Sequence, residues 1–227
     1  MKTAFYAGLA RAAALTAVLL LTACSQRAAD INHTLRVATV GYKDAVITKE
    51  YVTALPYAAI QFKWGDGPRV LSALAFAEND ELKWVTQDKT MIVTQHGRLV
   101  RTLGFSHDLT YTANINQDPL PQLLQLWQQG KHELLRWGTE HDWQPGYYSG
   151  YQAISRFEYR GQEQVSILGE PVTLIKFSEQ VVYPKLNIEQ ENTFWLAADT
   201  GVVIKSQQFI GPGLPAVEIT LLKPYQP

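Results

Sequence analysis

The sequence predicts a mainly β fold with antiparallel strands and a few short helices. Runs in which apolar and polar residues alternate occur along most of the chain, and this period of two is typical of half-buried strands. Short turns rich in Gly, Pro, Asn and Asp join the runs, whereas parallel neighbours would need crossover helices. A single stripe with the 3.6-residue period of a helix, at residues 117–131, separates two blocks of strands.

The N-terminal residues have the layout of an export signal. Lys2 and Arg11 supply positive charge, and the apolar run Ala12–Leu21 is far shorter than the roughly 20 residues that cross a bilayer. The run ends in Leu-Thr-Ala-Cys, which resembles a bacterial lipobox. We therefore expect cleavage after Ala23 and acylation of Cys24, which would hold the chain stably at a membrane. An ordinary signal peptide with an incidental cysteine is the alternative.

This interpretation divides the chain into a cleaved lipoprotein signal peptide (1–23), a lipidated tether (24–29) and a single β-rich domain (30–227). Two of the 20 basic residues lie in the signal, which leaves 18 against 21 acidic ones, and this balance disfavours a nucleic-acid binder. Cys24 is the only cysteine, so the domain has no disulfide, thiolate metal site or cysteine nucleophile. No Asp follows Cys24, and this favours the outer membrane.

Two helices are expected ahead of the first strands. The spacing of apolar residues predicts one helix between Asp30 and Gly41, and Thr48 begins a second short helix that ends at Leu55-Pro56. Five strands with alternating patterns follow, at Tyr57–Trp64, Arg69–Ala77, Glu81–Val85, Lys89–Thr94 and Arg98–Leu103. His96-Gly97 is predicted to form the tight turn between the last two strands.

The helical stripe at 117–131 begins with Asp118 as a cap, carries Pro121 in its first turn and ends at Gly130. Its apolar residues share one face, and they are Leu120, Leu123, Leu124 and Trp127. We expect this helix to cover an opening or an end of the sheet. The strand pattern returns from Arg136, with further strands at Tyr151–Arg160, Gln162–Leu168, Val172–Tyr183, Ile188–Ala197, Val202–Phe209 and Ala216–Leu222.

Several short segments occur in an order that resembles one family of bacterial lipoproteins. Besides the lipobox, these are Leu55-Pro56-Tyr57-Ala58, Gly97-Arg98-Leu99-Val100 with Thr102 and Gly104, Phe194-Trp195-Leu196 before Asp199-Thr200-Gly201, and Leu222-Lys223-Pro224. In this order they resemble the YjbF/GfcB family of outer-membrane lipoproteins, which is associated with group 4 capsule and exopolysaccharide operons. The resemblance covers nearly the whole mature chain.

A second resemblance concerns the fold. The segment Phe194–Ser206 is similar to the strand–Asp-x-x-Gly–strand hairpin of periplasmic lipoprotein carriers. That likeness implies a single antiparallel, strongly curved sheet or incomplete β-barrel, with a helix on its concave side.

Residues with catalytic potential do not form a recognisable motif. None of the five histidines lies in an HExxH or HxH arrangement, and we expect loop and turn positions for His33, His96, His107, His132 and His141. Glycoside cleavage would need two carboxylates across a cleft, and the available ones are Asp108, Glu140, Asp142 and Glu158. A solvated sheet face is expected for the alternating acids Glu179, Glu189 and Glu191.

One aromatic segment is the candidate contact site for a ligand or partner, and it comprises Trp137, Trp143, Tyr147, Tyr148 and Tyr151. Acids and amides lie between these aromatics. Sugar rings stack on aromatic faces while amides and acids bind hydroxyl groups, so the mixture suits a glycan. Trp and Tyr are also good strand residues, and a purely structural role is the competing interpretation.

The resemblance implies a non-enzymatic lipoprotein on the periplasmic side of the outer membrane of a Gram-negative bacterium. It would serve exopolysaccharide or capsule assembly or export, with no cofactor or metal. The expected partners are outer-membrane lipid through acylated Cys24, and exopolysaccharide or export proteins. One alternative is a carrier that holds an acyl chain in an apolar hollow lined by Ile60, Phe62, Trp64, Leu74 and Phe76. The other is an enzyme that trims the polymer.

Overall fold

The structure is a computed structural model that describes residues 47–146 and 148–226. The signal, the tether, the helix predicted between Asp30 and Gly41, and Tyr147 lie outside the described residues. Among the described residues, no helix is both long enough and apolar enough to cross a membrane.

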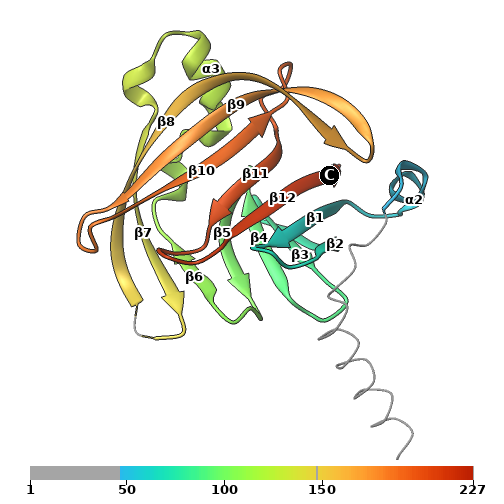
Figure 1. Cartoon of the computed structure of the whole chain (residues 1–227), viewed down its shortest axis with the longest axis horizontal. Helices are drawn as coiled ribbons and strands as arrows, with labels where there is room; N and C mark the ends of the chain where they lie inside the picture. Colours follow the sequence, from blue (N-terminus) through green and yellow to red (C-terminus); the bar gives the residue numbers. More distant parts are fainter. Residues whose placement is uncertain (1–46, 147, 227) are drawn as a thin grey trace, which may run out of the picture. The chain divides into compact units, whose positions relative to one another are not determined.

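The described part of the chain forms one sheet of twelve strands (Figure 1). The first six strands are β1 (Ala59–Trp64), β2 (Arg69–Glu78), β3 (Glu81–Val85), β4 (Met91–Gln95), β5 (Arg98–Leu103) and β6 (Asp108–Thr112). The remaining six are β7 (Arg136–Gln144), β8 (Tyr148–Ile167), β9 (Glu170–Tyr183), β10 (Ile188–Leu196), β11 (Val203–Phe209) and β12 (Ala216–Lys223). The helical elements are α2 (Lys49–Ala54), η1 (Ile115–Gln117), η2 (Leu120–Gln122), α3 (Leu123–Gln128) and η3 (His132–Leu134).

All neighbouring strands in the sheet are antiparallel. Each strand pairs with the next one from β1 to β5 and from β6 to β12, and β1 also pairs with β12, for example through Phe62 opposite Ile219. The order therefore runs from β5 through β1 and β12 to β6. The predicted mainly β, antiparallel and strongly curved sheet is confirmed.

The two edge strands β5 and β6 lie against each other and nearly close the sheet into a barrel. Their contact uses side-chain hydrogen bonds. Thr102 Oγ1 donates to Asp108 Oδ1 at 2.8 Å and accepts from Leu109 N at 2.9 Å, and Thr112 Oγ1 donates to Val100 O at 2.9 Å. Since each edge places a threonine against the other, the barrel is joined here by side chains.

Both predicted helices within the described residues are confirmed. Thr48 caps α2, because its Oγ1 accepts a hydrogen bond from Tyr51 N at 3.2 Å. The second helix comprises η2 and α3, and its buried face carries Leu120, Leu123 and Leu124. These leucines pack with aromatic side chains of β8, β9 and β10, among them Phe157, Phe177 and Phe194. The helix thus fills one part of the concave face, as expected.

Most strand ends differ from the prediction by a few residues at most, and two larger differences concern Gly161 and β6. The prediction has two strands, Tyr151–Arg160 and Gln162–Leu168, separated at Gly161, but β8 continues through Gly161 as a bulge against β9, with a φ of +95°. Glycine adopts this conformation equally in turns and in bulges, so the local sequence does not separate the two cases. Strand β6 was not predicted. It is short, and its pattern includes the exposed Tyr111, so alternation alone is a weak signal there.

Candidate functional site

The turn between β4 and β5 folds onto the concave face and contacts β11. His96 and Gly97 both have positive φ, at 49° and 86°, as the predicted tight hairpin requires. Gly97 O accepts a hydrogen bond from Gln208 Nε2, and Leu99 N donates to Gln208 Oε1, both at 2.9 Å. A Cβ at Gly97 would lie 2.5 Å from Val203 Cβ, so glycine is also needed for this close approach.

Arg98, next to this turn, lies in a buried ion-pair network. Its guanidinium donates to Asp118 at 2.8 and 3.1 Å and to Glu179 at 2.6 and 3.0 Å, so both pairs are bidentate. Asn192 Nδ2 donates to Glu179 at 2.8 Å, and the Trp137 ring centroid lies 4.7 Å from Arg98 Cζ. Burial alone would lower the pKa of Arg98, but the two carboxylates outweigh it and raise that pKa above its usual value.

The buried position of Glu179 corrects a sequence prediction. A solvated face was expected for Glu179, Glu189 and Glu191, and Glu179 is instead fully buried. It occurs in phase with the buried Phe177 and Val181 on β9, so the alternation already assigned it to the inner face. The sequence could not show that Arg98, 81 residues away, would neutralise it there.

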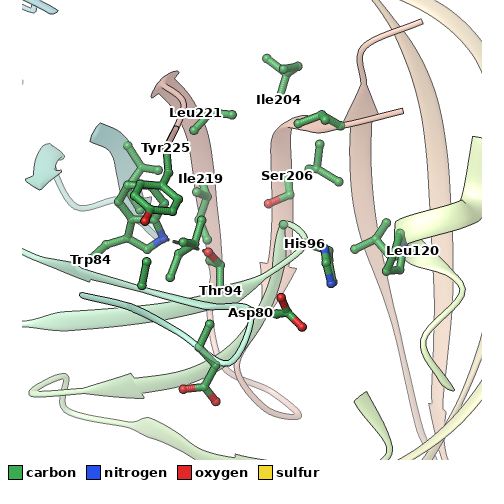
Figure 2. A pocket seen from close by; sticks show the side chains of 18 of the residues that line it. Asp80, Trp84, Thr94, His96, Leu120, Ile204, Ser206, Ile219, Leu221 and Tyr225 are labelled. Carbon is green, nitrogen blue, oxygen red and sulfur yellow. Dashed lines mark hydrogen bonds between the residues drawn. The ribbon is translucent and has the colours of Figure 1, made fainter. Parts of the chain in front are cut away.

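A cavity of about 550 Å³ lies beside this network, where β11 and β12 separate. The two strands pair from Phe209 opposite Ala216 to Lys205 opposite Thr220, and no further pair joins their described residues beyond that point. Ile204 then lines one side of the cavity and Leu221 the other (Figure 2). The cavity is therefore a gap between two neighbouring strands that extends into the concave face.

The floor of the cavity is apolar and buried. Ile60, Trp84 and Ile219 line it from β1, β3 and β12, and each is less than a tenth exposed. Two floor hydroxyl groups already have partners, because Trp84 Nε1 donates to Thr94 Oγ1 and Gln208 Nε2 donates to Ser206 Oγ, both at 2.8 Å. The floor thus offers an apolar surface.

The rim of the cavity is polar and comes mainly from turns. The turn between β2 and β3 contributes Glu78, Asn79, Asp80 and Glu81, and the turn between β10 and β11 contributes Thr200. Figure 2 shows Asp80 and His96 on neighbouring turns at this rim. Two of the acids are ion-paired, since Lys83 lies 2.8 Å from Glu78 and Arg101 lies 2.8 Å from Glu81.

Of the five positions predicted to line a hollow, only Ile60 lines this cavity. Phe62 belongs to a packed core cluster, and Trp64 and Leu74 pack against that cluster. The expectation for Phe76 is wrong, because this side chain is 58% exposed. A register shift between Leu74 and Phe76 places Phe76 opposite Lys83, so the strand turns the ring outward.

The aromatic segment at 137–151 is divided between two places. Trp143, Tyr148 and Tyr151 form one cluster, with ring centroids of Trp143 5.4 Å from Tyr148 and 4.9 Å from Tyr151. Trp143 is buried at 6% exposure, whereas Tyr148 is 44% exposed and stacks on it at an interplanar angle of 15°. Trp137 is buried elsewhere, against Arg98. Tyr147 lies outside the described residues.

His141 lies beneath this aromatic cluster and not in a loop as expected. It belongs to β7, and its Nδ1 is 2.8 Å from Tyr183 Oη. Burial and the positive charge of Arg98 lower the pKa of His141 to about 4. The same burial raises the pKa of Tyr183 above its usual value. The pair is therefore neutral over most of the pH range.

Three of the four candidate catalytic carboxylates form hydrogen bonds or ion pairs with other residues of the domain. Asp108 organises the loop before β6, accepting from Gly104 N at 3.0 Å as well as from Thr102. Asp142 accepts from Gly150 N at 2.8 Å, and Glu158 lies 3.0 Å from Arg160. Across residues 47–146 and 148–226, no group of three His, Cys, Asp or Glu side chains is arranged to hold a metal ion.

Comparison with known proteins gives consistent matches. The sequence model of the family described as "Group 4 capsule polysaccharide lipoprotein gfcB, YjbF" matches residues 32–222. The chain is 30% identical to the Escherichia coli (strain K12) lipoprotein GfcB over 207 residues, 91% of this chain and 94% of GfcB. It is also 30% identical to the lipoprotein YjbF of the same organism over 213 residues, 94% of this chain and 97% of YjbF.

A solved structure is also similar. The crystal structure of the hypothetical lipoprotein YmcC from Escherichia coli (K12) matches with a TM-score of 0.71 and 29% sequence identity. The match covers 86% of this chain and 96% of YmcC.

Proposed function

The chain belongs to the YjbF family of group 4 capsule polysaccharide lipoproteins, and we propose that it is a non-catalytic accessory protein of capsule or exopolysaccharide assembly or export. Acyl chains on Cys24 attach it to the periplasmic side of the outer membrane in this proposal. The lipobox and the lipoprotein relatives support the anchor, and the family description supports the pathway.

In this proposal, the cluster of Trp143, Tyr148 and Tyr151 contacts the polymer or an export protein through its exposed side. The supporting observation is Tyr148, whose ring stacks on the buried Trp143 and is still 44% exposed. A rigidly held aromatic face suits the C–H face of a sugar ring, and aromatic residues are also enriched in protein interfaces. Strand β8 supplies Tyr148 and Tyr151 together, which keeps the cluster on a rigid element.

Replacement of Tyr148 by Ala tests this contact. We expect lower polysaccharide output from cells that carry the variant as their only copy, with the thermal unfolding midpoint nearly unchanged because the ring is half exposed. Tyr111→Ala on β6 is the matched control, since Tyr111 is 52% exposed and lies outside the cluster. Full output with Tyr148→Ala would remove the site, and a large loss of stability would show that the ring is part of the core.

Replacement of Cys24 by Ser tests the anchor separately. We expect the variant to lose incorporation of labelled palmitate and to leave the outer-membrane fraction, since the thiol is the acylated group in this proposal. A Ser25→Ala variant is the control and should keep both properties. Continued labelling of Cys24→Ser with unchanged sedimentation would contradict the anchor and leave the aromatic contact untouched.

A further inference from the structure

We propose that the cavity between β11 and β12 binds the single apolar chain of an amphiphile whose head is uncharged and rich in hydroxyl groups. This inference goes beyond the function proposed above and does not depend on it, because the cavity and the aromatic cluster share no lining residue. Four properties of the cavity support it: its size, its apolar depth, the way the strands hold it open and the charge of its rim.

The size and the lining of the cavity suit an apolar chain. A volume of about 550 Å³ falls in the range of small-molecule sites. Below the rim, apolar side chains line the floor and both walls, and they are Ile60, Trp84, Leu120, Val203, Ile204, Ile219 and Leu221. Burial of an apolar chain against these side chains removes apolar surface from water and is therefore favourable.

The hydroxyl groups deep in the cavity do not oppose an apolar occupant. Thr94 Oγ1 already accepts from Trp84, and Ser206 Oγ already accepts from Gln208. An apolar chain beside them therefore breaks neither of these hydrogen bonds. A ligand that placed its own charged group at this depth would lose its hydration with little compensation.

The backbone keeps the cavity open, so it is not the result of one missing side chain. Strand β12 remains paired with β1 through Leu221 opposite Ile60, and β11 remains paired with β10 through Val203 opposite Leu196. Both ladders have a register shift at this level, next to Ile60 and next to Leu196. Such shifts bend strands, and here they accompany the separation of β11 from β12. Collapse of the cavity would require these ladders to re-pair.

The charge of the rim selects the head of the ligand. Lys83 and Arg101 balance Glu78 and Glu81, which leaves Asp80 as the acid outside these two ion pairs. Asn79 and Thr200 add neutral hydrogen-bonding groups to the rim. Hydroxyl groups can donate to Asp80 and pair with these neutral groups, whereas a carboxylate or phosphate head would be repelled.

The first experiment measures binding to the full chain carrying Cys24→Ser, so that no attached acyl chain competes. Octyl glucoside, octanoate and glucose are titrated calorimetrically below their micellar concentrations. We expect octyl glucoside to bind one molecule per chain, octanoate to bind about tenfold more weakly, and glucose not to bind. Absence of octyl glucoside binding would overturn the proposal. Binding of glucose as tight as that of octyl glucoside would also overturn it. If octanoate bound as tightly as octyl glucoside, the proposal that the head of the ligand is uncharged would be wrong.

The second experiment locates the bound chain with variants that fill the cavity. Leu221→Trp places a large ring in the cavity and should weaken octyl glucoside binding by at least a factor of about ten. Leu222→Trp is the matched control, because Leu222 is the next residue of β12 and does not line the cavity. Val202→Trp is a second blocking variant that the fold should tolerate, since Val202 lines the cavity and is 48% exposed. Unchanged binding in both blocking variants would overturn the site.

The third experiment tests the rim. Asp80→Asn removes the negative charge and should abolish the roughly tenfold discrimination against octanoate. Asp66→Asn, in the exposed turn between β1 and β2, is the control and should keep the discrimination. If Asp80→Asn still discriminates as the unsubstituted chain does, Asp80 does not select the head.

Discussion

Strands β8 to β10 and strands β11 and β12 form neighbouring parts of one sheet, yet the concave face is filled over the first group and hollow between the second. Over β8 to β10, the leucines of the helix at 120–128 and the side chain of Arg98 pack against the sheet. Between β11 and β12, the strands separate and leave about 550 Å³. Curvature alone therefore does not decide whether the inside of such a sheet is a core or a cavity. The segments that pack against the concave face, here the helix at 120–128 and the side chain of Arg98, decide whether that face is filled.

The two regions also differ in how their polar groups are satisfied. In the filled region, Arg98, Asp118 and Glu179 neutralise one another away from water. At the cavity, the charged groups stay at the rim and the floor keeps only paired hydroxyl groups. We infer that a change in the buried ion-pair network costs more stability than a change in the half-buried walls of the cavity.

The largest expected effect comes from breaking the buried network. Glu179→Ala should lower the free energy of unfolding by about 4 kcal/mol, because it leaves the charge of Arg98 buried with only Asp118. The measurement is urea denaturation at neutral pH. Glu189→Ala, on an exposed position of β10, is the control and should change the free energy by less than about 0.5 kcal/mol. Equal effects of the two variants would contradict the role of the network.

The next prediction compares the loss of unfolding free energy for one leucine from each region. Leu123→Ala should cost about 3 kcal/mol, because Leu123 is fully buried between the helix and the sheet. Leu221→Ala should cost about 1 kcal/mol, because this side chain is half-buried and borders the cavity. Denaturant unfolding of both variants gives the comparison. A larger loss from Leu221→Ala would mean that the cavity wall is a structural core.

A further effect concerns the pH dependence of the free energy of unfolding, which His141 in the filled region should influence. The pKa of His141 is lowered to about 4, so between that value and its unfolded pKa near 6.5 the unfolded chain binds more protons. Protonation of His141 should therefore lower the free energy of unfolding by about 3 kcal/mol as the pH drops from 7 to 4. His141→Gln should flatten this part of the profile. A profile that His141→Gln does not alter would contradict this assignment.

Much of the fold could be predicted from local pattern. The strand runs, the helix with Leu120, Leu123 and Leu124, the Thr48 cap and the His96-Gly97 turn all depend on neighbouring residues, and the structure has each of them. The bulge at Gly161 was missed because glycine serves a bulge and a turn equally well.

The candidate sites were predictable only in part. The aromatic segment was found from its composition, and Trp143, Tyr148 and Tyr151 do lie together. Trp137 could not be separated from them, because its burial against Arg98 depends on a hairpin 40 residues earlier in the chain.

By itself, the sequence determined the mainly β class, the positions of most strands and the family to which the chain belongs. The tertiary structure alone decided that Glu179 meets Arg98, that Phe76 faces outward and that β11 separates from β12. The physical reason is that alternation along a strand tells which residues share a face. Which face is covered, and which segment covers it, depends on register shifts and on contacts between residues distant in the chain.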